Sequence, residues 1–217
     1  MCFSASASFG ASAILAVIGV TAVVKAKKLP HRLFAAIPFI FSIQQFSEGM
    51  LWLSVKDTGL ATYHSLFTTV FLIFALVVWP FYIPFTIWLL EKDARRKKTL
   101  TIVLGAGAAV SICLICVLLI YPVQVVHNHH IHFNFAFPPI AKNLTFFVSL
   151  LYFAATIIAP FISGIKRMKW LGIVFLASYL FSVIFYSGFL VSVWCYFASL
   201  LSIVVLWIVL GLRKSVS

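Results

Sequence analysis

The chain has 217 residues, of which 64% are hydrophobic and only 9% are charged, and its mean hydropathy is +1.15. Soluble domains carry about a quarter charged residues, so this composition excludes a water-soluble globular protein and predicts an integral membrane protein. The formal net charge is +12. Because the basic residues stand in short turns between apolar stretches, we expect contact with membrane lipids and no nucleic-acid partner.

Apolar stretches long enough to cross a bilayer, at roughly 20 residues each, recur seven times along the chain. They cover residues 8–24, 33–54, 65–90, 100–121, 144–164, 170–187 and 190–212. We therefore predict an all-α fold, in which residues 1–217 form a single domain of seven transmembrane helices. The boundary between the last two helices is placed at Ser187-Gly188, because this pair is the turn signal in a long apolar tract.

The positions of the basic residues predict the orientation of the bundle. Lysine and arginine accumulate in cytoplasmic loops. Fourteen of the 16 basic residues lie in the first, third and fifth turns or at the C-terminus: Lys25, Lys27, Lys28, Arg32, Lys92, Arg95, Arg96, Lys97, Lys98, Lys166, Arg167, Lys169, Arg213 and Lys214. We expect the N-terminus outside, the C-terminus in the cytoplasm, and location in the plasma membrane, which in a bacterium is the inner membrane.

Glu48 is the acidic residue that lies inside a predicted helix rather than in a turn. Gln44, Gln45 and Trp52 are three or four positions away, so all four side chains share one helical face. An ionisable group within a bilayer costs several kcal/mol and normally faces the bundle interior. We expect Glu48 to act as a metal ligand or proton acceptor, with Gln44 and Gln45 orienting it and Trp52 lining its cavity. The alternative is a protonated carboxylic acid that only fixes helix packing.

Two other groups are candidates for chemistry at the outer face. Cys2 would present a thiolate and an α-amine together if Met1 is removed, a pair that can chelate a metal or act as a nucleophile. The fourth turn, residues 122–143, contains four histidines within six residues: His127, His129, His130 and His132. Neutral imidazole is the commonest protein ligand of transition metals. The alternative is a polar external loop without a metal.

The fourth turn also alternates between apolar and polar residues, which is typical of extended backbone. We predict a hairpin-like segment that lies on the bundle. Its phenylalanines are expected to dip into the membrane interface, and its polar edge is expected to face the mouth of the bundle or water. The apolar edge includes Phe133, Phe135 and Phe137, and the polar edge includes His130, His132 and Asn134.

Cys113 and Cys116 have the spacing of redox and metal motifs, three positions apart on one helical face. Inside an apolar helix, cysteine is more often a small hydrophobic residue, and we favour that interpretation here. A disulfide of either residue with Cys2 or Cys195 stays open.

The opening residues 1–9, Met-Cys-Phe-Ser-Ala-Ser-Ala-Ser-Phe, are followed in the second predicted helix by Gln44-Gln45, Glu48-Gly49 and Trp52. Together they resemble an uncharacterised family of prokaryotic multi-pass membrane proteins that begin Met-Cys-Phe-Ser-Ala. The resemblance implies that Cys2 and the Gln-Gln-x-x-Glu-Gly stretch belong to a shared feature. It transfers no activity.

Three functions are consistent with these residues. The first is binding of a transition metal or metal cofactor such as copper, zinc or haem at an outer-face pocket, with ligands among Cys2, Glu48, His129, His130 and His132. The second is a membrane-embedded hydrolase or transferase, with Cys2 as nucleophile and Glu48 as acid or base. The third is a receptor or accessory subunit without chemistry at these residues, either as a homo-oligomer or within a larger membrane complex.

Overall fold

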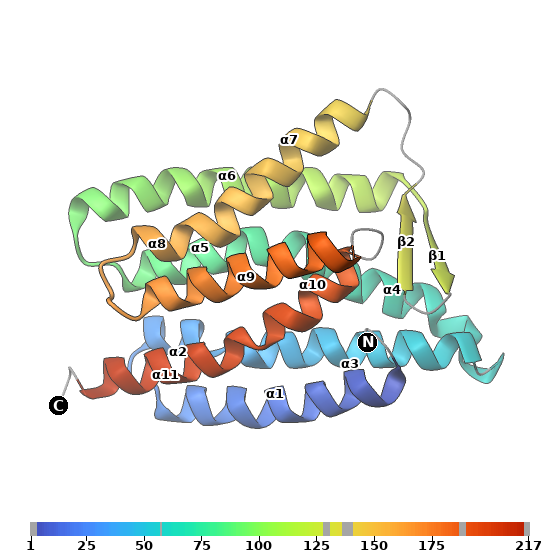
Figure 1. Ribbon diagram of the computed structural model, residues 1–217, viewed down its shortest axis with the longest axis horizontal. Helices are drawn as coiled ribbons and strands as arrows, with labels where there is room; N and C mark the ends of the chain where they lie inside the picture. The colour runs from blue at the N-terminus through green and yellow to red at the C-terminus, as the bar shows by residue number, and fades with distance from the viewer. Residues whose placement is uncertain (1–3, 57, 128–130, 136–140, 187–189, 215–217) are drawn as a thin grey trace.

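The computed structural model of the chain describes residues 4–56, 58–127, 131–135, 141–186 and 190–214. These residues are almost entirely helical, and two short strands form a hairpin. The long helices lie side by side in Figure 1, with the hairpin at one end of the bundle. The turns between α1 and α2, between α5 and α6, and between α8 and α9 lie at the opposite end.

The first half of the chain contains α1 (Ala5–Lys25), α2 (Leu29–Ala35), α3 (Ile37–Lys56), η1 (Thr58–Tyr63), α4 (His64–Leu72), η2 (Ile73–Val78), α5 (Trp79–Leu90) and α6 (Ala94–Ile120). The second half contains β1 (Val123–His127), β2 (Ile131–Phe135), α7 (Ala141–Phe153), η3 (Ala154–Ile158), α8 (Ala159–Ile162), α9 (Met168–Tyr186), α10 (Leu190–Ser199) and α11 (Leu201–Lys214). The segments η2 and η3 are π-helical.

Five helical segments of the described chain are long and apolar enough to cross a membrane: Ala5–Lys25, Gly59–Leu90, Ala94–Ile120, Met168–Tyr186 and Val191–Leu212. The apolar helix Phe146–Ile162 is shorter. Helix α3 is long enough to cross a membrane, but it contains two glutamines and a glutamate, which lower its mean hydropathy. The prediction of an all-α protein is confirmed, and its described part contains helices that are long and apolar enough to span a membrane.

Two of the predicted helices are interrupted. The expected helix 33–54 is divided at Ala36, so α2 and α3 are separate helices, because Pro38 has no amide hydrogen to continue the hydrogen bonds of the preceding turn. The expected helix 190–212 is divided by a turn at Leu200. Just before that turn, the Ser199 hydroxyl donates to the carbonyl oxygen of Tyr196 at 2.5 Å, a type of bond that bends helices.

Two π-helical segments each precede a proline: η2 precedes Pro80, and η3 precedes Pro160. Wide turns and prolines leave backbone carbonyls without regular helical donors. Side chains from neighbouring helices donate to the carbonyls of η2, since the Tyr152 hydroxyl bonds the Ala75 oxygen and the Ser111 hydroxyl bonds the Val77 oxygen, both at 2.7 Å. The irregular segment therefore stays inside the bundle without unpaired backbone at these two carbonyls.

Small residues bring α1 and α3 into close contact. The Ser12 hydroxyl donates to the Ser42 carbonyl oxygen, and the Ser42 hydroxyl donates to the Ser12 carbonyl oxygen, both at 2.9 Å. A Cβ atom at Gly19 would lie 2.6 Å from the backbone nitrogen of Phe39, so only glycine fits there. Close approach through small residues is a common basis for helix association in membranes, and here it fixes α3 against α1.

The fourth turn folds as an antiparallel hairpin in which Val125 pairs with Phe133 and Gln124 with Asn134. This confirms the hairpin-like backbone, but the expectation that the phenylalanines dip into the membrane interface is wrong for Phe133. Phe133 is only 8% exposed and stacks on Phe71 with ring centroids 5.3 Å apart, whereas Gln124 and Asn134 are exposed. Phe133 contributes to the protein core instead of the membrane interface, and Phe137 lies outside the described residues.

The buried apolar side chains form two clusters, and α3 passes through both. The larger one contains Phe41, and the smaller one, near the hairpin, contains Leu51 together with Phe71 and Phe133. Gln44, Gln45 and Glu48 lie on α3 between Phe41 and Leu51. A polar layer therefore separates the two apolar clusters inside the bundle.

Candidate functional site

Glu48 lies in the polar layer and is completely buried. Its Oε1 atom accepts a hydrogen bond from the Ser192 hydroxyl at 2.5 Å. Ser192 is also completely buried and belongs to α10, 144 positions further along the chain. The expectation that Glu48 faces the bundle interior is confirmed, and α10 is the helix that supplies a partner.

Gln44 connects α3 to α5 through its side-chain oxygen. The indole nitrogen of Trp79 donates to Gln44 Oε1 at 2.7 Å, and both residues are buried. The Trp79 ring also stacks on Phe41, with centroids 3.9 Å apart and planes inclined at 21°. These contacts fix the position of Gln44 and of the helical face that it shares with Glu48.

Gln45 differs from Gln44 at its side-chain oxygen. Gln44 lacks a described hydrogen-bond partner at Nε2 alone, whereas Gln45 lacks one at both Nε2 and Oε1, although its side chain is 0% exposed. The hydroxyl of Ser8, on α1, is likewise buried and has no described partner. An unsatisfied buried polar group costs about 1–3 kcal/mol. Most buried polar groups in folded proteins are bonded, so Gln45 marks a place where a polar partner fits.

Cys195 adds a thiol to the same layer. It is 5% exposed and follows Ser192, the partner of Glu48, by three positions on α10, so both side chains lie on one face of that helix. Trp52, 7% exposed, belongs to the same buried cluster as Cys195 and Phe133. The hairpin therefore covers the side of the polar layer that contains Trp52 and Cys195.

The predicted ligands outside α3 are only partly described. Cys2, His129 and His130 lie outside the described residues. His132 lies in β2, opposite Val126, and its side chain is not described. Within the part of the chain that the structure describes, no group of three or more His, Cys, Asp or Glu side chains could hold a metal ion. The metal site therefore stays a prediction.

Other residues singled out from the sequence lie away from this layer. The His64 ring is half-buried, with Nδ1 3.0 Å from the Ser54 hydroxyl. Cys113 is half-buried on α6 and Cys116 is exposed there, and both are free thiols, as is Cys195. The positions of the Cys113 and Cys116 side chains are consistent with their interpretation as small apolar residues.

Sequence reasoning missed Ser192 as a partner of Glu48 and did not include Cys195 among the site residues. Both lie in an apolar tract where serine and cysteine are common as small residues of helix contacts. Their spacing of three positions, which places both on one face of α10, was the available signal.

A model of the family of unknown function DUF6629 matches residues 1–216, so the chain belongs to that family. No curated protein and no solved structure matches the chain. Membership agrees with the resemblance to an uncharacterised family, whereas the role of Cys2 and of the Gln-Gln-x-x-Glu-Gly stretch stays a prediction.

Proposed function

We propose that the protein crosses the plasma membrane seven times and binds a small polar ligand within the layer around Glu48. Helix α3 and the segment Phe146–Ile162 would add two spans to the five long apolar segments. The basic turns gather at one end of the bundle, which supports a cytoplasmic position for that end and an outer position for the hairpin and the N-terminus.

The observation that carries the binding proposal is the pair formed by Gln45 and Glu48. Both side chains are completely buried on α3, and the Gln45 amide offers a donor and an acceptor with no described partner. Glu48, held by Ser192, supplies an acidic group close by. A ligand that both donates and accepts hydrogen bonds would satisfy Gln45 and compensate for its desolvation.

A transition metal or metal cofactor is the narrower form of this proposal. Its support is the position of the hairpin, because Phe133 packs in the same cluster as Trp52 and Cys195. The next residue back along β2 is His132. Ala5, three positions after Cys2, also packs against that cluster. In this form Glu48 is a ligand together with Cys2, His129, His130 or His132, and Gln44 and Gln45 orient it.

Native mass spectrometry of the full chain, released gently from bacterial membranes, tests the general proposal. We expect a bound non-protein mass that is lost in Glu48→Gln and in Gln45→Met. Ser47→Ala is the matched control, because Ser47 is buried on α3 but its hydroxyl bonds the carbonyl of its own helix at Ile43. Retention of the same mass in all three variants would refute ligand binding at this layer.

Elemental analysis of the same sample tests the metal form. A metal site predicts a content near one equivalent of copper, zinc or iron per chain, reduced in Glu48→Gln. A content below about 0.1 equivalent in the wild-type protein would exclude the metal while leaving the polar ligand in place.

A further inference from the structure

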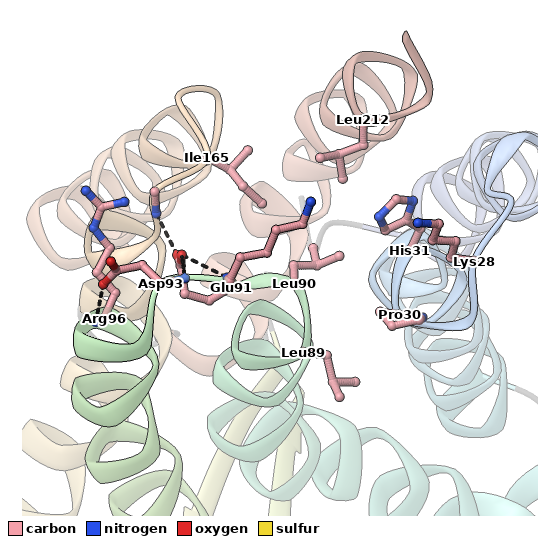
Figure 2. A pocket seen from close by; sticks show the side chains of 12 residues that line it. Lys28, Pro30, His31, Leu89, Leu90, Glu91, Asp93, Arg96, Ile165 and Leu212 are labelled. Carbon is pink, nitrogen blue, oxygen red and sulfur yellow. Dashed lines mark hydrogen bonds between the residues drawn. The ribbon is translucent and has the colours of Figure 1, made fainter. Parts of the chain in front are cut away.

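A hollow of about 510 Å³ lies at the basic end of the bundle, which we define as the end with the α1–α2, α5–α6 and α8–α9 turns. Figure 2 shows Lys28 and His31 on one side of it, Glu91 and Ile165 on the other, and Leu212 between the two sides. Lys92 also lines it. The size falls within the range of small-molecule sites. It is formed by segments other than those around Glu48.

The acidic side chains of the hollow are occupied by backbone hydrogen bonds. Glu91 is 6% exposed, and its carboxylate accepts from the Gly164 amide at 2.7 Å and from the Lys92 and Asp93 amides at 3.1 Å each. The Asp93 carboxylate accepts from the Arg96 amide at 2.9 Å and caps α6. These bonds tie the α5–α6 turn to the turn before α9 and give the hollow a fixed wall.

The remaining lining is positively charged at the rim and apolar below it. Burial lowers the pKa of His31, and the charges of Lys28 and Lys92 lower it further, so both lysines act on the same imidazole. Both lysines are exposed. Leu89 and Leu212 contribute half-buried apolar surface to the same hollow. A cationic rim above an apolar wall matches a ligand with an anionic head and a hydrocarbon body.

We propose that this hollow binds the phosphate headgroup of an anionic membrane lipid, with Lys28, His31 and Lys92 around the phosphate and the first acyl carbons along Leu89 and Leu212. Basic pockets between helices at the cytoplasmic end of membrane proteins take such headgroups. The apolar wall favours a lipid over free phosphate, because inorganic phosphate would leave Leu89 and Leu212 in contact with water.

Calorimetric titration of the purified full-length protein in detergent tests this site, with dioctanoyl phosphatidylglycerol, dioctanoyl phosphatidylcholine and inorganic phosphate as separate probes. The anionic lipid is expected to bind more tightly than either other probe. In Lys28→Gln/Lys92→Gln its affinity should fall about thirtyfold, from roughly fivefold for each lysine near a membrane surface. Leu89→Gln should weaken the lipid and leave phosphate unchanged.

Lys27→Gln/Lys98→Gln is the matched control, because it removes the same charge from the basic end at residues that do not line the hollow. Its affinity should change less than threefold. An equal loss in the two double variants would overturn the proposal, because the whole end and not this hollow would then attract the lipid. Equal binding of the two lipids, or phosphate binding as tightly as phosphatidylglycerol, would overturn it as well.

Discussion

Gln44 and Gln45 provide a direct test of the polar layer, because they are adjacent, equally buried and differ in their bonding. Methionine has nearly the same shape as glutamine and a similar helix propensity, so it removes the amide with little change in packing. Gln45→Met removes two buried polar atoms that have no described partner. We expect the free energy of unfolding to rise by about 2 kcal/mol, since an unsatisfied buried polar group, here the whole amide, costs about 1–3 kcal/mol.

Gln44→Met should leave the free energy of unfolding nearly unchanged. It breaks the 2.7 Å hydrogen bond from Trp79 and leaves the buried indole nitrogen without this acceptor, but it also removes Gln44 Nε2, which is buried without a described partner. Each of these two effects is worth about 2 kcal/mol and they have opposite signs. For a chain of this size, roughly 2–4 °C per kcal/mol predicts that Gln45→Met melts about 4–8 °C above Gln44→Met.

Thermal unfolding in one detergent at fixed pH, read by circular dichroism, measures the difference. The experiment should use protein stripped of any bound ligand, because a ligand stabilises the wild-type protein and not Gln45→Met. If Gln45→Met melts no higher than Gln44→Met, the Gln45 amide is well bonded in the apo protein and offers a ligand no unpaired group.

Three further predictions concern packing and pH. Gly107→Ala should lower the free energy of unfolding by about 1–3 kcal/mol, because its Cβ atom would collide with the Pro80 carbonyl oxygen. Gly105 has open space around it, so Gly105→Ala should be neutral or stabilising by up to about 1 kcal/mol in the same unfolding assay. Tyr152→Phe should cost about 0.6–1.7 kcal/mol by losing the bond to Ala75, and an unchanged melting temperature would contradict the role of that bond. Burial raises the pKa of Glu91, but hydrogen bonds from the Gly164, Asp93 and Lys92 amides outweigh it and hold the pKa below its ordinary value of 4.5. The ionised Glu91 carboxylate therefore stabilises the folded protein above pH 4.5, and this stabilisation is lost as the pH falls through the lower pKa of the folded state. Acid should reduce the melting temperature of the wild-type protein more than that of Glu91→Gln.

The helical architecture and the buried face of α3 could be predicted because both follow from local pattern. Apolar length indicates membrane helices, and the four-residue spacing of Gln44, Glu48 and Trp52 defines one face. The partner of that face could not be predicted in the same way. Ser192 lies 144 positions from Glu48, and periodicity does not say which helices become neighbours.

The orientation of the hairpin could not be predicted from the sequence. The alternation of apolar and polar residues predicted its extended backbone, but the same alternation is compatible with either edge facing the bundle. Burial of Phe133 beside Phe71 removes it from water just as insertion into the membrane interface would, so hydrophobicity alone does not choose between the two orientations.

The π-helical segments have a consequence for comparing members of the family. A π turn accommodates one more residue than an α turn, and one residue corresponds to about 100° of helix rotation. Deleting a single residue within η2 would let a regular helix form without turning α5 away from its present neighbours. We therefore expect one-residue length differences between related chains to fall in this stretch and not in the surrounding helix.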